Sequence, residues 1–417
     1  MNVTGWRCAT CSAELPISTP LPFRCPKASA NDPRHVLQIV HDDSPVTTVD
    51  NDSTFVAADL HLAWAAYAEA HGMTADDRAC LVGELNTVIE AVDGATFVVT
   101  PFERSAVVSD ALGMSAEGGV WVKDETGGVG GSQKARFLFS ILLHLRAAER
   151  LGHLTKRPPL AIASCGNAAL AAATLARAAD WPLDVYVPTW MSDGFGDRLD
   201  ALGARVHRSE RRDGDPPGDP AMLRFRDAVA NGAIPFTVQG PENALCLDGG
   251  RTLGWEIGTQ FPGTHIDRLF IQVGGGAFAA ATSAGLDSIH GVVPLHAVQA
   301  AGCAPLERAW KRSIDTDDVA EVWAEAMTVW DNPSSLADGI LDDETYDWVG
   351  VVEAMRRNGG IPVVAPEADI EAAHRLAHEA GYNVSPTGSA GLAGLLTMSG
   401  DIAPNEHIVV VLSGVTR

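Results

Sequence analysis

The sequence is poor in lysine and in positive charge. It has 30 Lys and Arg residues against 53 Asp and Glu residues, a net charge of −23 at pH 7 and a pI of about 4.8. No basic stripe is available to neutralise phosphates, which excludes a nucleic-acid partner. A mechanism that needs a lysine amine has five candidates, namely Lys27, Lys123, Lys134, Lys156 and Lys311.

Long apolar runs and a disulfide framework are also missing. No apolar stretch approaches the roughly 18 residues that a membrane span needs. The opening MNVTGWRCATCS has no basic segment followed by an apolar one, so we expect neither a membrane segment nor a secretory signal. Seven cysteines without framework spacing indicate reduced thiols, which predicts a cytoplasmic protein whose partner is a small molecule.

What is present is a regular alternation of apolar runs and alanine-rich helical patterns. Each run has the length of a buried strand, and the alternation predicts parallel sheets covered by helices. The predicted strands are Val120–Lys123, Leu160–Ala163, Leu183–Val187, Ala204–His207, Phe236–Val238, Leu269–Val273, Leu295–Gln299 and His407–Leu412. The predicted helices include Ala57–His71, Gln133–Leu151, Ala168–Ala179 and Ile370–Ala380.

These patterns predict an α/β fold of two lobes, each built on a doubly wound parallel sheet. With 417 residues of which 46% are hydrophobic, the chain is long enough for two such domains. We predict an irregular, ribbon-like segment over residues 1–50, a first region over 51–257 and a second region over 258–417.

One lysine follows a glycine-rich turn. Residues 120–138 read VWVKDETGGVGGSQKARFL, which predicts a strand, a turn and a helix beginning near Gln133 with Ser132 as its N-cap. Lys134 then lies in the first helical turn, where the helix dipole disfavours its charged form. A neutral amine is what Schiff-base chemistry needs. The alternative is an ordinary surface lysine near a helix start.

A second turn follows Leu160–Ala163. Small polar residues at the carboxyl end of a strand are typical of ligand sites in α/β proteins, and the backbone N–H groups of the next helix favour a carboxylate. An ordinary N-cap turn is the alternative. The residues that we predict to contact a substrate are Ser132, Ser164, Cys165, Gly166, Asn167 and Ala168.

Two further turns follow buried strands. Gly274, Gly275 and Gly276, with Ala277 after them, predict an anion nest suited to phosphate. This turn also fits a dinucleotide pattern, but the acidic residue that such sites place about 20 positions later is missing. Ser413 follows the last predicted strand, where its hydroxyl can face a buried ring; a simple strand end is the alternative.

In their order along the chain these turns resemble the fold-type II pyridoxal 5'-phosphate enzymes. That superfamily includes threonine synthase, serine/threonine dehydratase and the β-subunit of tryptophan synthase. The resemblance covers about residues 100–417. It matches Gly131–Arg136 to the lysine segment, Ser164–Asn167 to the substrate and cofactor loop, Gly274–Ala277 to the phosphate loop, and Ser413-Gly414 to the pyridine contact.

The resemblance implies a role for each turn. Lys134 carries the cofactor as a Schiff base and later acts as general base, Asn167 holds the ring oxygen, and Gly274–Gly276 with Ala277 hold the phosphate. Ser413 offers the ring nitrogen a neutral hydroxyl, which favours elimination and replacement at the side chain over transamination. Ala135 stands where many relatives have an aspartate. Because members of the family are commonly homodimers, the resemblance also implies a homodimer.

The segment Val298–Pro305 looks most like threonine synthases, so the first expected activity is conversion of O-phosphohomoserine to threonine and phosphate. The alternatives are a serine/threonine dehydratase, a cysteate or cysteine synthase-like β-replacement enzyme, or a binding subunit that has lost catalysis. A phosphorylated substrate needs a second anion site, for which Arg104, Arg136 and Arg251 are candidates.

The N-terminal cysteines resemble part of the zinc-ribbon element of some threonine synthases. Cys8 and Cys11 form one Cys-x-x-Cys pair, but Ala28 stands where Cys25 needs its partner. The prediction is therefore that no metal is bound. The alternative is zinc on these three cysteines, with His35 as a fourth ligand at an unusual spacing.

Overall fold

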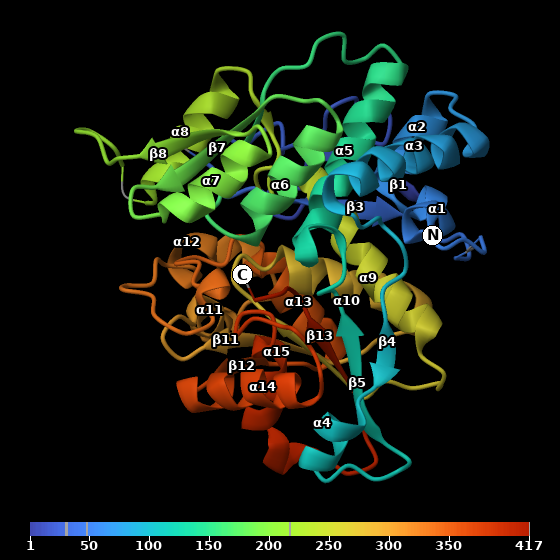
Figure 1. Ribbon diagram of the computed structural model, residues 1–417, viewed down its shortest axis with the longest axis vertical. Coiled ribbons are helices and arrows are strands. Elements are labelled where there is room, and N and C mark those ends of the chain that lie inside the picture. The colour runs from blue at the N-terminus through green and yellow to red at the C-terminus, as the bar shows by residue number, and fades with distance from the viewer. Residues whose placement is uncertain (30–31, 47–48, 217, 417) are drawn as a thin grey trace.

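Two sheets organise the chain, one in each lobe (Figure 1). The structure, a computed structural model, describes residues 1–29, 32–46, 49–216 and 218–416. The smaller sheet is parallel throughout, in the order β8-β7-β6-β9. Its strands are β6 (Leu160–Ala163), β7 (Leu183–Pro188), β8 (Arg205–Ser209) and β9 (Ile234–Pro235).

The larger sheet has the order β12-β11-β10-β13-β5-β4. Neighbouring strands of this sheet pair in parallel, except that β4 runs antiparallel to β5. Its strands are β4 (Phe102–Arg104), β5 (Gly119–Asp124), β10 (Arg268–Gln272), β11 (Leu295–Ala300), β12 (Pro362–Ala365) and β13 (His407–Leu412). In Figure 1 the teal β4 and β5 reach down into the lobe formed by the orange and red segments.

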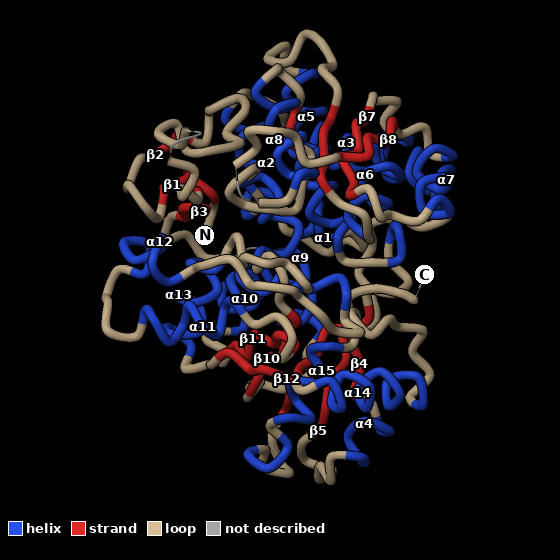
Figure 2. Tube along the Cα trace, turned by 90° about the vertical axis from the view of Figure 1, so that its left-hand side faces the viewer, coloured by secondary structure: helices blue, strands red, loops and turns tan. Residues whose placement is uncertain are grey.

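Helices cover both faces of the larger sheet, and its central strands are mostly apolar. Alternate residues of β13 face opposite layers: Val409 and Val411 join the core shared with α9 (Leu247–Gln260) and α10 (Ala277–His290). Ile408 and Val410 join the core under the helices α14 and α15. Figures 1 and 2 both place α9, α10 and α13 between this sheet and the other lobe.

The remaining helices complete the two lobes. They are α3 (Ala75–Asp93), α4 (Ala106–Ala111), α5 (Lys134–Arg150), α6 (Asn167–Ala178), α7 (Asp193–Ala201), α8 (Pro220–Ala230), α11 (Pro305–Ser313), α12 (Trp323–Ala326), α13 (Trp348–Asn358), α14 (Glu367–Glu379) and α15 (Ala390–Thr397). Short 3-10 turns include η2 (Val129–Gly131), η3 (Ala244–Cys246) and η5 (Asp338–Ile340). Across the described ranges, no helix combines the length and the apolar character needed to span a bilayer.

Most predicted elements form close to their predicted bounds, and β6 and β13 have the bounds predicted. Two predictions are wrong. The strand Phe236–Val238 does not form, because the strand here is β9, two residues earlier in the chain. The helix Ala57–His71 is broken into α1 (Thr54–Ala57), a 3-10 turn over Asp59–His61 and α2 (Ala63–Ala70). Asp59 has a positive φ of 33°, which a continuous helix does not allow.

The segment predicted to be irregular contains an antiparallel sheet of the order β2-β1-β3. Its strands are β1 (Val3–Cys8), β2 (Glu14–Pro16) and β3 (Leu37–His41); residues 30, 31, 47 and 48 of this segment lie outside the described part. The predicted domain boundary at residue 257 stays a prediction. The sheet order adds that β4 and β5, which precede it, pair within the sheet of the later region.

Candidate active site

The order of the larger sheet brings three of the predicted turns together. β10, β13 and β5 are neighbours and run parallel, so the turns that follow them meet at one edge. These turns carry Gly274–Gly276, Ser413-Gly414 and the loop before Lys134. The predicted lysine, phosphate turn and ring contact therefore share one end of the sheet.

Backbone hydrogen bonds tie the lysine loop to the last turn. Ser132 and Gly414 form an antiparallel bridge, and the Gln133 N–H donates to the Ser413 carbonyl at 3.0 Å. The turn after β6, in the other lobe, reaches the same place, since a Cβ on Gly414 would lie 2.8 Å from Asn167 Nδ2 and 3.1 Å from Ser132 Cβ. The turn after β6 therefore meets the lysine loop and the last turn, which lie at the same edge of the larger sheet as the glycine turn.

Lys134 is the first residue of α5, as predicted, but Ser132 is not its N-cap. Gln133 holds that position and no side chain caps the helix. Ser132 is extended (φ −164°, ψ 155°) because its backbone bridges Gly414. Its buried Oγ has no partner among the described residues, and it lines a small cavity of about 10 Å³ together with Thr100 and Arg136.

The amine of Lys134 meets the requirement for a weakly basic lysine. Burial lowers the pKa of Lys134, although the charges of the nearby Asp342 and Asp347 carboxyl groups act to raise it. No hydrogen bond or ion pair to its Nζ occurs within the described ranges. The Nζ of Lys134 is therefore buried near these carboxyl groups without a hydrogen-bond partner in those ranges, which suits a nucleophilic amine.

A buried ion cluster fixes the start of α5. Arg136 donates from Nε to Glu125 at 2.7 Å and from Nη1 to Glu256 at 2.6 Å, and Lys123 Nζ donates to the other Glu256 oxygen at 2.5 Å. Burial alone raises the pKa of Glu256, but the charges of Arg136 and Lys123 outweigh it and lower that pKa to about 2. A Cβ on Gly249 of α9 would collide with the Arg136 backbone, so this glycine permits the close approach of α9 to α5.

The arginines considered for a substrate phosphate are all engaged elsewhere. Arg136 belongs to the ion cluster, and Arg104 donates to the backbone carbonyls of Gly118 and Ser115 at 2.9 and 3.2 Å. Arg251 donates to the backbone carbonyl of His61 at 2.7 Å. None of these three guanidinium groups is free to face the glycine turn.

The glycine turn is covered by an acidic segment that sequence reasoning missed. Gly276 has a φ of +96°, and a Cβ on Gly274 would collide with the carboxylate of Asp342. Burial raises the pKa of Asp342 to about 6, although the charge of Lys134 and a hydrogen bond from the Gly275 backbone favour its charged form. A carboxyl group therefore lies where the turn offers its N–H groups to an anion. Nothing in the local sequence links residue 342 to this turn.

A second missed carboxyl group lies beside it. Asp347 is buried and accepts a hydrogen bond from the Gly240 N–H at 3.0 Å through Oδ2, while its Oδ1 has no partner within the described part of the chain. Burial raises the pKa of Asp347 to about 7. Its own N–H donates to the Gly275 carbonyl at 2.7 Å, which ties this segment to the glycine turn.

Ser413 is held by Gln272, the last residue of β10. Gln272 Nε2 donates to Ser413 Oγ at 2.6 Å and to the Gly388 carbonyl at 2.9 Å. Because a carbonyl can only accept, the amide nitrogen must face both groups, and Ser413 accepts. The Ser413 proton is thus left to donate to a neutral acceptor. Gln272 lay within a predicted strand, so its role had no sequence signal.

The substrate turn is partly open. Ser164, Cys165, Gly166 and Asn167 are all partly buried, and the Gly166 N–H donates to Ser164 Oγ at 3.3 Å. Asn167 begins α6, which has no side-chain cap, so the first N–H groups of the helix are available to a carboxylate. Burial raises the pKa of Cys165, which keeps its thiol neutral.

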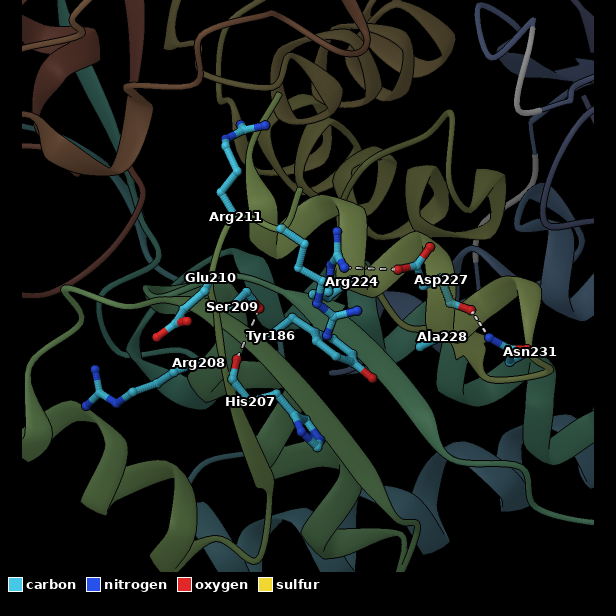
Figure 3. Close-up of a pocket in the computed structure, with 11 residues that line it drawn as sticks. Tyr186, His207, Arg208, Ser209, Glu210, Arg211, Arg224, Asp227, Ala228 and Asn231 are labelled. Carbon is cyan, nitrogen blue, oxygen red and sulfur yellow. Dashed lines mark hydrogen bonds and ion pairs between the residues drawn. The ribbon is translucent and has the colours of Figure 1, made fainter. Parts of the chain in front are cut away.

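A separate hollow of about 640 Å³ lies over β8 and α8 (Figure 3). Tyr186, His207 and several arginines line it, and it contains none of the predicted site residues. Figure 3 shows Arg211 pointing away from the other side chains. This hollow is therefore separate from the site formed by the four turns.

The four turns fit pyridoxal 5'-phosphate. The glycine turn already accommodates an anionic group, the Asp342 carboxyl, and leaves no room for a Cβ. Ser413 has a free donor for a ring nitrogen, Asn167 offers an amide, and Lys134 offers an amine.

Comparisons with known proteins identify the family of the chain. The model of the family described as pyridoxal-phosphate dependent enzyme matches residues 96–414. A threonine synthase of Methanosarcina acetivorans is 26% identical over 326 residues, which are 76% of this chain and 74% of that protein.

Solved structures show the same fold. Maize serine racemase has a TM-score of 0.63 at 17% identity, covering 81% of this chain and 93% of its own. The processed form of threonine deaminase isoform 2 from Solanum lycopersicum has a TM-score of 0.61 at 19% identity, covering 91% and 90%. The chain has the fold of the type II enzymes, belongs to the pyridoxal-phosphate dependent enzyme family and takes pyridoxal phosphate as its cofactor.

Proposed function

We propose that the chain catalyses elimination or replacement at the β or γ carbon of a small amino acid, as a carbon–oxygen lyase or a threonine synthase-like enzyme. The observation that carries the proposal is the meeting of Lys134, the glycine turn and Ser413 at one edge of the larger sheet. When bound, the cofactor supplies an acceptor for the electrons left at Cα.

Lys134 has two tasks in this proposal. Its Nζ holds the cofactor covalently, for which burial has prepared it by lowering its pKa. With the cofactor and a substrate bound, the same Nζ would serve as the general base for the proton at Cα of the substrate. The N–H groups at the start of α6 and the Ser164 hydroxyl bind the substrate carboxylate, with Cys165, Gly166 and Ala168 around it, and Asn167 orients the ring.

Ser413 decides the type of reaction. Its hydroxyl, which accepts from Gln272, would hold the ring nitrogen of the cofactor as a neutral donor and would not protonate it as a carboxylic acid does. The bound cofactor would then be a weaker acceptor for the electrons left at Cα, which favours loss of a leaving group from the side chain. This supports side-chain elimination over transamination.

Two substrates compete within the proposal. The threonine synthase relative and the segment Val298–Pro305 support O-phosphohomoserine as substrate, with threonine and phosphate as products. The engagement of Arg104, Arg136 and Arg251 supports the second candidate, a serine or threonine dehydratase or a β-replacement enzyme, whose substrate needs no site for a second phosphate. The acidic carboxyl of Asp342 near the glycine turn also opposes a second phosphate there.

A substrate screen tests both candidates. The purified protein, loaded with cofactor, is mixed separately with O-phosphohomoserine, threonine, serine, O-phosphoserine and O-acetylserine, and its visible absorption is followed. Release of threonine, phosphate and keto acid identifies the reaction. A spectral change with O-phosphohomoserine and release of threonine select threonine synthase chemistry, whereas keto acid from serine or threonine selects the dehydratase.

The proposal fails if the wild-type protein shows no cofactor absorption after loading, or if it binds the cofactor and responds to none of these amino acids. The second outcome selects a binding subunit that has lost catalysis. We also propose a homodimer in the cytoplasm; sedimentation of the loaded protein at two concentrations tests the dimer, and a single monomer mass would overturn it.

A further inference from the structure

Three cysteines and one histidine of the N-terminal segment converge on a single point. Cys8 ends β1, Cys11 lies in the turn after it, Cys25 lies in the following loop and His35 precedes β3. Cys8 Sγ lies 3.4 Å from His35 Nδ1, and Cys11 Sγ lies 3.5 Å from Cys25 Sγ. All four potential ligand atoms lie within 4.8 Å of one another.

These separations match a tetrahedral zinc site. With Zn–S bonds near 2.3 Å and a Zn–N bond near 2.0 Å, the edges of such a tetrahedron are about 3.5–3.8 Å long. A disulfide between Cys11 and Cys25 would need their sulfurs about 2.05 Å apart, far closer than the observed 3.5 Å. The Cys8–His35 and Cys11–Cys25 separations fit such edges, and the 4.8 Å limit on all other pairs leaves the four atoms around a common centre.

The histidine is oriented as a ligand. His35 Nε2 lies 3.1 Å from the Asp32 carboxylate, so Nε2 carries the proton and donates it, while the lone pair of Nδ1 points toward the sulfurs. His35, Cys8 and Cys25 are all less than 5% exposed. A buried imidazole aimed at three thiols, with a carboxylate behind it, is an arrangement that metal sites use and that ordinary packing does not require.

A tight backbone turn brings the sulfurs of Cys8 and Cys11 together. The Ser12 N–H donates to the Cys8 carbonyl at 2.9 Å, and Ser12 adopts a positive φ of 55°. This tight turn places Cys11 beside Cys8. The sequence pattern lacked a fourth cysteine because Ala28 stands in its place, and the fold supplies His35 instead.

We propose that Cys8, Cys11, Cys25 and His35 bind one structural zinc ion. Four protein ligands leave no open position for a substrate or water, so the ion has no catalytic role. The proposal does not depend on the reaction that the cofactor site performs.

The ion would fix the N-terminal segment against the elements that carry the active site. The loop between Pro16 and Cys25 contacts them by its backbone: the Pro20 carbonyl accepts from His144 Nε2 of α5 at 2.6 Å, and the Phe23 carbonyl accepts from the Ala244 N–H of η3 at 2.8 Å. α5 begins at Lys134 and η3 leads into α9. Loss of the metal would release this loop, so we expect lower stability with an intact cofactor chemistry.

The first test uses the wild-type full chain. Elemental analysis of protein purified without added metal is expected to give one zinc per chain. After growth with Co²⁺ in place of zinc, the protein is expected to show the intense visible bands of tetrahedral cobalt and a thiolate-to-cobalt charge-transfer band. Both readouts are independent of enzyme activity and of cofactor content.

Matched variants assign the ligands. Cys11→Ser and His35→Ala are expected to lose the metal, whereas Cys80→Ser, which removes an exposed cysteine of α3, is expected to keep it. His35→Cys restores a four-ligand set and is expected to bind zinc. Asp32→Ala keeps the ligands and is expected to weaken zinc affinity roughly 10–100-fold in a chelator competition.

Two outcomes overturn the proposal. One is wild-type protein that contains no metal and shows no tetrahedral cobalt bands after addition of Co²⁺ to the reduced chain. The other is a thiol titration of the denatured wild type that reveals a disulfide among Cys8, Cys11 and Cys25. Both measurements use the wild-type protein, so they decide the question even if a variant fails to fold.

Discussion

Gln272 Nε2 donates a hydrogen bond to Ser413 Oγ across 2.6 Å, and this contact decides which way the serine proton points. Gln272 is the last residue of β10, and Ser413 directly follows the neighbouring strand β13. A hydroxyl that accepts from an amide keeps its own proton for another partner. The glutamine thus acts as a positioning residue for the ring contact.

Replacing Gln272 is expected to act through Ser413. Gln272→Leu leaves the Gly388 carbonyl without its donor and lowers the free energy of unfolding by about 1–3 kcal/mol. Gln272→Glu has the same shape but accepts the serine proton, so we expect kcat to fall roughly tenfold further than in Gln272→Leu, with KM little changed and with a shift of the cofactor's visible absorption. Equal spectra for the wild type and Gln272→Glu would contradict this role.

Lys134→Ala is expected to abolish covalent attachment of the cofactor and to lower the turnover rate by roughly 10²–10⁴-fold, because the amine is both the anchor and the general base. Borohydride treatment of the loaded protein, followed by peptide mapping, measures the attachment site. Lys156→Ala removes an exposed lysine and serves as the control. Label on any residue other than Lys134 in the wild type would refute the assignment.

Asp342 is expected to make cofactor affinity depend on pH. Burial raises the pKa of this acid to about 6, so its carboxylate is charged above that pH, where it repels the phosphate in the glycine turn. We expect Asp342→Asn to bind pyridoxal phosphate roughly tenfold more tightly than the wild type at pH 8 and about equally at pH 5. Titration by absorption measures this, and Asp331→Asn, an exposed acid, controls for net charge.

The raised pKa values of the buried aspartates also determine how the stability of the folded chain changes with pH. Asp342 and Asp347 have pKa values of about 6 and about 7 in the folded chain, above the roughly 4 of an unfolded aspartate. Ionisation therefore opposes folding, and the stability of the cofactor-free protein should decrease between pH 4 and pH 7 through these groups. Urea unfolding across this range, compared between the wild type and Asp347→Asn, checks the slope; a wild type no steeper than the variant would be inconsistent with it.

Arg136→Met is expected to lower the free energy of unfolding by about 3–5 kcal/mol, because it leaves Glu125 and Glu256 buried with too little positive charge. Glu256 has a pKa lowered to about 2, so its contribution is present above the unfolded value of about 4.3 and is lost as pH falls toward 2. Chemical denaturation at pH 7 and pH 3 measures both effects. Arg146→Met, a partly exposed arginine of the same helix, is the control, and equal losses in the two variants would contradict the special role of the cluster.

The sequence alone predicted those features that depend on residues close together along the chain. Gly274–Gly276 and Ser413 were found because a buried strand followed by small residues is visible along the chain, and the sheet order then brought them together. Asp342 and Gln272 were missed because their importance lies in contacts between segments distant in sequence. The cap predicted at Ser132 failed because a bridge to Gly414 pulls its backbone into an extended form.

The N-terminal strands were missed for a different reason. β1, β2 and β3 are short and separated by prolines and cysteines, so no periodicity spans them. The sequence offered His35 only as an alternative ligand, and the structure places its Nδ1 3.4 Å from Cys8 Sγ.

The position of β13 has a consequence for how the molecule is made. This strand lies between β10 and β5, and it is the last strand in the described part of the chain. Until this strand is in place, one edge of β10 and one edge of β5 are unpaired, and open apolar edges of this kind favour aggregation during folding. Because Ser413 directly follows the same strand, a folding intermediate that lacks β13 has neither a closed sheet nor Ser413 in its place beside Gln272.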